Sequence, residues 1–126
     1  RRMSSQSKLS FVRIVVDDMH RAEQFYTGTF GLRRTAMTDA DDGLEVVLQG
    51  DGDMSLALYH WKDRRAFALG SAQQIGFVVD DVDMVYESAI AAGAQPAQPP
   101  TDYDGSVRAA FVHDPDGHNI ELIRWG

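Results

Sequence analysis

An internal repeat limits the folds that this chain can adopt. The tetrapeptide Val-Val-Asp-Asp at residues 15–18 recurs at residues 78–81, an offset of 63 residues. The apolar segments 56–61 and 120–125 resemble each other at an offset of 64. Because two matches near opposite ends of each half share nearly one offset, they indicate a duplicated supersecondary unit.

Each half has the pattern of one strand, one helix and three further strands. In the first half an apolar strand over residues 11–16 ends in two aspartates, which can accept hydrogen bonds from the free N–H groups at the start of a helix. Apolar residues then recur at helical spacing over 19–30, and Gly31 suits the left-handed position after a helix. Three strands are expected over residues 32–37, 44–49 and 55–61.

The second half repeats this order, with one change after its helix. Its opening strand is expected over residues 75–79. Three prolines within residues 96–100 make the next segment an irregular or edge strand, because proline cannot donate to a sheet ladder. The last two strands, 107–113 and 119–125, flank Asp-Pro-Asp-Gly at 114–117, a sequence that predicts a tight hairpin turn.

Composition and charge exclude several classes of protein. The net charge is −7 with no long basic run, which argues against binding to nucleic acid. No segment approaches the roughly 20 apolar residues of a membrane helix, so we expect no membrane partner. Cysteine is absent, which excludes thiolate nucleophiles and cysteine-ligated zinc. The N-terminus shows no secretory signal pattern, so a cytoplasmic location is expected.

Taken together, these elements resemble the vicinal oxygen chelate superfamily. That superfamily includes glyoxalase I, extradiol dioxygenases, methylmalonyl-CoA epimerase, fosfomycin-resistance enzymes and bleomycin-binding proteins. The resemblance implies an α+β fold in which two βαβββ modules form a curled mixed sheet, a partial barrel around a cavity. It covers residues 9 to 125 and rests on Asp17-Asp18, Phe25-Tyr26, Gly31-Leu32, the 114–117 turn and Ile120-Glu121-Leu122.

A chain of 126 residues fits a single domain, which we place at residues 9–126. Module one is expected at 9–61, a linker at 62–72 and module two at 73–126. Residues 1–8 are polar and patternless and are expected to form a disordered tail. Superfamily members are usually dimers, so we expect a homodimer, with its cavity built either within one chain or across the pair.

Strand alternation indicates which side chains line the expected cavity, because successive residues point to opposite faces. Ile120 and Leu122 are expected to face the helix. The concave side is then expected to carry Phe11, Arg13, Ala57, Tyr59, Trp61, Gln74, Gly76, Glu121, Ile123 and Trp125.

Metal-dependent members of the superfamily place one ligand at each of four positions on such strands, which here hold Phe11, Ala57, Gln74 and Glu121. Phenylalanine and alanine have no lone pair to donate, and one carboxylate with one amide is too few ligands for a tight site. We therefore expect neither a metal nor another cofactor. The histidines are expected at the surface, in a cap or on the helix side of a strand: His20, His60, His113 and His118.

The concave side therefore predicts a pocket for a small molecule, lined by large aromatic faces and few polar groups. Phe11, Tyr59, Trp61 and Trp125 would stack on a planar ligand, or alternatively fill a core. Arg13 would anchor a carboxylate or enolate of the ligand, or alternatively form a buried ion pair with Glu121. Gln74 adds a polar group.

Glu121 carries the catalytic hypothesis. A carboxylate in an apolar cavity is desolvated, which raises its pKa and suits a general base. Arg108, on the strand before the hairpin, is a candidate at the pocket rim. Tyr103 lies in a proline-rich loop, 95–106, that could cover the cavity mouth.

Three functions remain open, and with them the question whether the chain is an enzyme. The first is a metal-independent protein that sequesters a hydrophobic or aromatic molecule or catalyses a proton transfer with Glu121. The second is a metal-dependent enzyme of the glyoxalase, epimerase or dioxygenase type. The third is a partner-binding or structural domain, which would have no open cavity.

Overall fold

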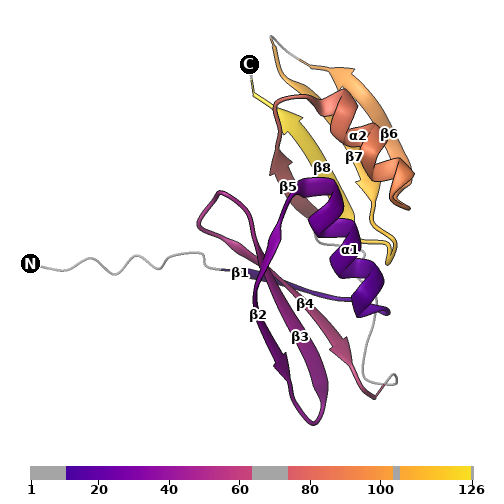
Figure 1. Ribbon diagram of the computed structural model, residues 1–126. Coiled ribbons are helices and arrows are strands. Elements are labelled where there is room, and N and C mark those ends of the chain that lie inside the picture. Colours follow the sequence, from indigo (N-terminus) through magenta and orange to yellow (C-terminus); the bar gives the residue numbers. More distant parts are fainter. Residues whose placement is uncertain (1–10, 64–73, 104–105, 126) are drawn as a thin grey trace, which may run out of the picture.

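The computed structural model describes residues 11–63, 74–103 and 106–125. The expected tail and most of the expected linker lie outside these residues. The described elements form two successive βαβββ units (Figure 1). In chain order they are β1 (Phe11–Val15), α1 (Met19–Phe30), β2 (Arg33–Asp39), β3 (Gly43–Gln49), β4 (Ser55–Trp61), β5 (Gln74–Val78), α2 (Val82–Ala91), β6 (Gln95–Asp102), β7 (Arg108–His113) and β8 (Asn119–Arg124).

The two units have the same sheet topology, which confirms the duplication. The strand order is β1-β4-β3-β2 in the first four-stranded sheet and β5-β8-β7-β6 in the second. The opening strand of each unit runs parallel to its last strand, and the other neighbours are antiparallel. Neither sheet closes into a barrel. The expected α+β fold of two βαβββ modules is confirmed.

The helix starts follow the expected local chemistry. The Asp18 side chain accepts a hydrogen bond from the backbone N–H of Arg21 at 3.1 Å, and Asp81 does the same for Met84 at 3.1 Å. Each aspartate thereby satisfies one of the N–H groups that a helix start leaves free. Gly31 follows α1 with φ at 70°, the left-handed conformation that glycine adopts without steric cost.

The proline-rich segment forms an edge strand and not the expected loop. β6 pairs only with β7, and its register shifts twice along its length. An edge strand forms ladder bonds on one side only, so it tolerates the missing N–H groups of its prolines. The expected edge strand is thus confirmed. The prediction of a cavity-covering loop over residues 95–106 is wrong for residues 95–102, which form this strand.

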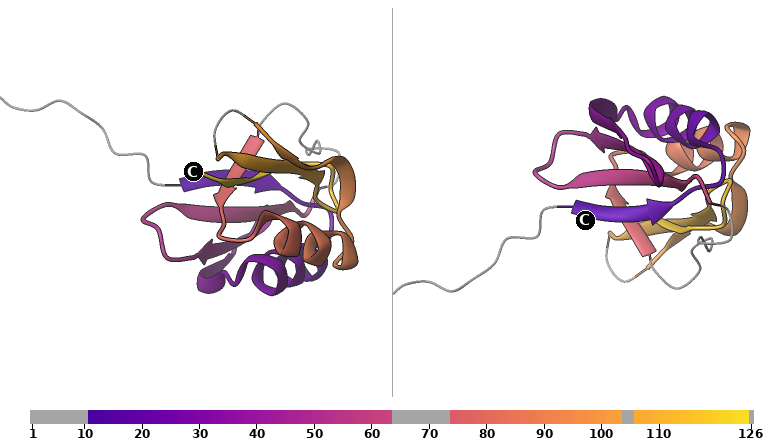
Figure 2. Two further views of the ribbon diagram at one scale, coloured as in Figure 1. Left: turned by 90° about the horizontal axis from the view of Figure 1, so that it is seen from above. Right: turned by 90° about the horizontal axis from the view of Figure 1, so that it is seen from below.

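The helix-facing sides of both sheets share a single apolar core with the two helices. Figure 2 shows α1 and α2 side by side, and they contact each other. At the end of α1 the ring of Phe30 stacks on Phe77 of β5, with ring centroids 3.9 Å apart. None of the helices in the described residues is long and apolar enough to cross a membrane. Core members include Ile14, Val46, Leu48, Leu56, Leu58, Phe25, Tyr26, Val82, Ala89, Val112, Ile120 and Leu122.

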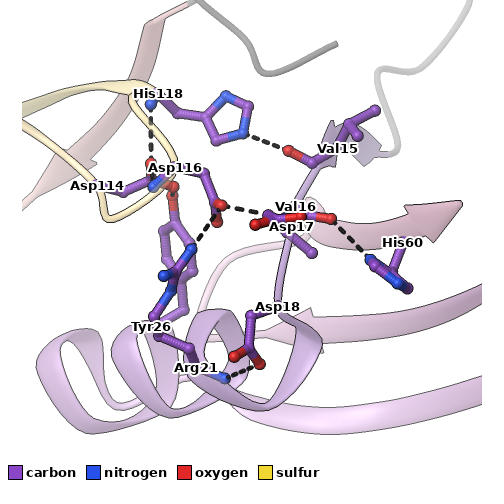
Figure 3. Close-up of polar contacts among 10 residues, drawn as sticks. All are labelled: Val15, Val16, Asp17, Asp18, Arg21, Tyr26, His60, Asp114, Asp116 and His118. Carbon is purple, nitrogen blue, oxygen red and sulfur yellow. Dashed lines mark hydrogen bonds and ion pairs between the residues drawn. The ribbon is translucent and has the colours of Figure 1, made fainter. Parts of the chain in front are cut away.

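Polar contacts also join the two modules, at the hairpin turn between β7 and β8 (Figure 3). His118, expected near the surface, is fully buried, so that expectation was wrong. The turn packs on the end of β1, where the imidazole Nε2 of His118 lies 2.7 Å from the carbonyl oxygen of Val15. His60 lies 3.1 Å from the carbonyl oxygen of Val16 through its Nδ1. Both rings therefore contact the backbone at the start of the β1–α1 connection.

Candidate functional site

Strand alternation separates the side chains as expected. Leu56 and Leu58 of β4, and Ile120 and Leu122 of β8, belong to the core between sheet and helix. The residues that alternate with them lie on the opposite side of each sheet, which we call its open face. This places Tyr59 and Trp61 on the first open face and Glu121 on the second.

The open face of the first sheet contains a hollow of about 330 Å³. This volume lies at the lower end of the range of small-molecule sites, about 300–1,000 Å³. We call it the aromatic hollow, since one side is formed by two aromatic rings. Its lining residues are Arg13, Val15, Thr38, Ala40, Gly43, Glu45, Tyr59 and Trp61.

An ion pair crosses the floor of the aromatic hollow. Arg13 on β1 donates from Nε to Oε2 of Glu45 on β3 over 2.8 Å, and its Nη2 lies 2.7 Å from the same oxygen. Because β4 lies between these strands, the pair spans β4. The guanidinium carbon lies 5.5 Å from the ring centroid of Phe11 and 5.7 Å from that of Tyr59. Within one chain Arg13 therefore pairs with Glu45, and not with Glu121 as the alternative interpretation had it.

Tyr59 and Trp61 form the aromatic wall of the hollow. Their rings meet edge to face, with centroids 4.7 Å apart. The Tyr59 hydroxyl donates to Oδ1 of Asp42 over 3.3 Å. Desolvation raises the pKa of Tyr59, and the Asp42 carboxylate raises it further. The hydroxyl therefore remains protonated at neutral pH and acts as a donor.

Gly43 is required for this position of Tyr59. A Cβ atom at residue 43 would overlap the Tyr59 hydroxyl and lie 2.7 Å from ring carbon Cε2. Real Cβ atoms essentially never approach another heavy atom so closely. Glycine thus allows the Tyr59 ring to lie directly against the backbone of β3.

The open face of the second sheet holds Gln74 and Glu121. The Gln74 side-chain amide donates to Oε1 of Glu121 over 3.1 Å. A separate hollow of about 280 Å³ lies beside them, lined by Gln74, Ala97, Gln98, Phe111, Val112, His113, Asn119 and Ile120. It shares no lining residue with the aromatic hollow. Glu121 itself lines neither hollow, so within one chain it does not lie with Tyr59 and Trp61.

The remaining predicted residues lie outside both hollows. Phe11 and Trp125 are exposed, at 53% and 64%. Tyr103 is exposed, and its hydroxyl accepts a hydrogen bond from the Gln98 amide. Arg108 lies on the same side of β7 as the helix-facing Ala110 and Val112, and its guanidinium donates to Asp83 and Asp102. Its donors are therefore engaged beside α2.

The four positions at which the sequence resemblance implies metal ligands do not provide a suitable set of donors. Phe11 and Ala57 offer no lone pair, and the side-chain amide of Gln74 is directed at Glu121. Elsewhere in the described residues, no three or more His, Asp or Glu side chains are grouped so that they could hold an ion. The donor chemistry at these positions does not fit a divalent metal ion.

Five lining residues of the aromatic hollow were missed by the sequence analysis: Val15, Thr38, Ala40, Gly43 and Glu45. Strand alternation had been applied to the opening and closing strands of each module but not to β3. Along β3 the same alternation puts Gly43, Glu45 and Val47 on the open face. A charged residue between two apolar neighbours, Leu44 and Val46, was the available signal for Glu45.

Comparisons of sequence and structure show which known proteins this chain is similar to. The family model of the Glyoxalase/Bleomycin resistance protein/Dioxygenase superfamily matches residues 8–122. A probable lactoylglutathione lyase of Vibrio parahaemolyticus is 29% identical, over 95% of this chain and 92% of the relative. Among solved structures, TnmS3, an antibiotic binding protein from Streptomyces sp. CB03234, has a TM-score of 0.77 at 24% identity, over 98% of this chain and 100% of that chain. Glyoxalase I from Zea mays has a TM-score of 0.82 at 22% identity, over 94% of this chain and 45% of the maize chain.

Proposed function

This chain belongs to the Glyoxalase/Bleomycin resistance protein/Dioxygenase superfamily, and on that premise we propose that it binds a small aromatic molecule in the aromatic hollow without a metal ion. The observation that carries the proposal is the composition of the first open face. Tyr59 and Trp61 offer aromatic surface there. Phe11 and Ala57 hold two of the four positions at which the sequence resemblance implies metal ligands, and neither side chain can donate a lone pair. Binding must then come from side chains alone.

The physical basis is stacking and burial. Aromatic rings prefer offset or edge-to-face contact with another ring, and such a contact adds about 0.5–1.5 kcal/mol beyond the burial of area. Val15, Thr38 and Ala40 supply apolar atoms on the other sides of the hollow. A planar molecule of a few fused rings matches this combination of aromatic wall and small apolar residues.

We further propose that two copies of the chain form a homodimer that completes the site. β1 and β5 are both sheet edges, and each exposes an apolar residue, with Phe11 at 53% and Val78 at 72%. A second copy that covers these edges would bring its own Glu121 opposite the aromatic hollow. Glu121, held by the Gln74 amide, is then the candidate general base for proton transfer.

A binding titration tests the proposal. We expect acridine, uncharged in mildly alkaline buffer, to bind saturably in the presence of a metal chelator, as followed by fluorescence anisotropy. Replacing Tyr59 with alanine should weaken binding about tenfold, since a lost ring contact of about 1.4 kcal/mol corresponds to that factor. Met84→Ala, at an exposed position of α2, is the matched control. Absence of saturable binding by the wild-type chain would contradict the proposal.

A second candidate function is lactoylglutathione lyase activity, which is favoured by the name of the Vibrio relative. It is tested by following formation of S-lactoylglutathione from methylglyoxal and glutathione with added nickel or zinc. We expect no turnover above the uncatalysed rate. Metal-dependent turnover would favour the second candidate over the first. If any turnover is found, Glu121→Gln should abolish it yet preserve acridine affinity.

A further inference from the structure

The charges around the aromatic hollow determine which aromatic molecules it favours. At the sequence level Arg13 suggests an anionic ligand, because a free guanidinium attracts carboxylates. In the structure, however, both Nε and Nη2 of Arg13 are directed at Oε2 of Glu45. The positive charge at the floor is therefore already compensated by a partner within the protein.

Glu45 retains capacity to accept a further hydrogen bond. Both contacts from Arg13 reach the same oxygen, Oε2, and no hydrogen bond from the described residues reaches Oε1. Glu45 lines the hollow, and its side chain is 22% exposed. One carboxylate oxygen at the floor is thus available to accept from a ligand.

The turn beside the hollow adds negative charge. Asp39 ends β2, and Asp41 and Asp42 lie in the turn that leads from β2 to β3. Lys62 is the counter-ion for this turn, with its Nζ 2.7 Å from Asp39, and Asp42 accepts from the Tyr59 hydroxyl. Among these described residues, with Glu45 and Arg13 included, four carboxylates stand against two cations, an excess of two negative charges.

Aromatic faces and carboxylates attract the same kind of ligand. The π-face of an aromatic ring is electronegative and draws cations to within about 6 Å of its centroid. The guanidinium of Arg13 already lies at such distances from Phe11 and Tyr59. A ligand ammonium near Tyr59 and Trp61 would meet both ring faces and the free oxygen of Glu45.

From these contacts we propose that the aromatic hollow selects planar aromatic ligands that carry a protonated amine over ligands of the same shape that carry a carboxylate. This inference rests on the proposed function, because it specifies the ligand class of the same hollow. Glu45 is the specificity-determining residue. It neutralises Arg13 and offers the acceptor that a ligand ammonium needs.

The test compares two probes with one ring system and opposite charge. In mildly alkaline buffer 9-aminoacridine is a cation and acridine-9-carboxylate an anion, and both can be followed by fluorescence anisotropy. We expect 9-aminoacridine to bind about tenfold more tightly, a difference of about 1.4 kcal/mol. The preference should decline as salt is added, because salt screens partly exposed charges.

Two single substitutions, one of a glutamate in the hollow and one of a glutamate outside it, show which residue causes the preference. Glu45→Gln should weaken binding of 9-aminoacridine about tenfold and strengthen binding of acridine-9-carboxylate, because Arg13 is released. Glu87→Gln, on the exposed surface of α2, removes the same charge away from the hollow and should change neither. Unfolding curves of both variants show whether the fold is kept.

The results of these experiments distinguish a failure of the inferred ligand class from a failure of the proposed function on which it rests. If both charged probes and uncharged acridine bind equally well, or the carboxylate binds better, the ligand class is wrong while the proposed function stands. If Glu45→Gln leaves the preference unchanged in a folded protein, Glu45 does not determine it and the inference fails. If no probe binds saturably, the proposed function itself fails.

Discussion

The hydroxyl of Tyr26 donates to Oδ2 of Asp114 over 2.6 Å and thereby joins helix α1 of the first module to the hairpin turn of the second (Figure 3). Both side chains are buried, with Tyr26 at 0% and Asp114 at 1% exposure. Oδ1 of Asp114 accepts from the backbone N–H groups of Asp116 and His118. One carboxylate thus organises the turn and its contact with α1.

Removing the Tyr26 hydroxyl should destabilise the fold. Burial and the Asp114 carboxylate raise the pKa of Tyr26, so its hydroxyl remains a donor at all ordinary pH values. Tyr26→Phe leaves a buried carboxylate oxygen without this donor, and we expect a loss of about 1.5–3 kcal/mol in the free energy of unfolding. Urea unfolding measures it. Tyr86→Phe is the control, because the Tyr86 hydroxyl makes no hydrogen bond with the described residues. Equal losses in both variants would contradict the expectation.

Asp116 should make stability depend on pH in a defined direction. Its side chain is 1% exposed, and its Oδ2 is buried without a hydrogen-bond partner among the described residues. Burial raises the pKa of Asp116, although the N–H of Asp17 and the guanidinium of Arg21 oppose the shift. The folded protein therefore takes up this proton at a higher pH than the unfolded chain, so protonation favours the fold as pH falls.

Replacement of Asp116 by asparagine removes that titration. The quantity to follow is the free energy of unfolding of Asp116→Asn minus that of the wild type. This difference should decrease as the pH is lowered from neutral to acidic, because only the wild type gains stability from the proton. Urea unfolding of both proteins across this pH range measures the difference. If this difference instead increases toward acidic pH, the folded protein stabilises the charged carboxylate of Asp116, and the expectation is contradicted.

Gly43 should be necessary for the aromatic wall. A methyl group at this position would occupy the space of the Tyr59 ring and separate it from Asp42. Gly43→Ala should therefore weaken acridine binding about tenfold, as the loss of one ring contact of about 1.4 kcal/mol requires. Gly52→Ala, at a position with open space around it, is the control for binding. Unchanged affinity in Gly43→Ala would show that the wall is not part of the site.

The proposed dimer makes a prediction about the β5 edge. Val78 is 72% exposed at the end of an edge strand, and the unpaired backbone groups of such a strand can pair with a second chain. Val78→Asp should shift the protein from dimer to monomer in sedimentation experiments at micromolar concentration. Met84→Asp, at an apolar position on α2 that is 62% exposed, should leave the mass unchanged. A monomeric wild type would rule out the dimer.

Local sequence patterns predicted most of the fold because its elements are determined by short-range chemistry. The expected strand over 55–61 coincides with β4, and the expected helix over 19–30 with α1. Capping aspartates, a glycine after the helix and strand alternation each act within a few residues. The burial of His118 could not be predicted in this way, because it depends on how the second module packs on β1.

The candidate site was predicted only in part for the same reason. Alternation correctly assigned Tyr59 and Trp61 to the open face. The pairing of Arg13 with Glu45 depends on the strand order β1-β4-β3, which alternation within single strands does not contain. The position of Glu121 outside the hollow that holds Tyr59 depends on the packing of whole modules.

The central claim, that this chain binds its ligand through side chains alone, is tested most directly by native mass spectrometry after incubation with manganese, nickel or zinc and removal of unbound metal. The account predicts masses of the polypeptide or its dimer without a stoichiometric metal adduct, and an acridine adduct when acridine is added. One retained ion per chain, lost in Glu121→Ala, would contradict it.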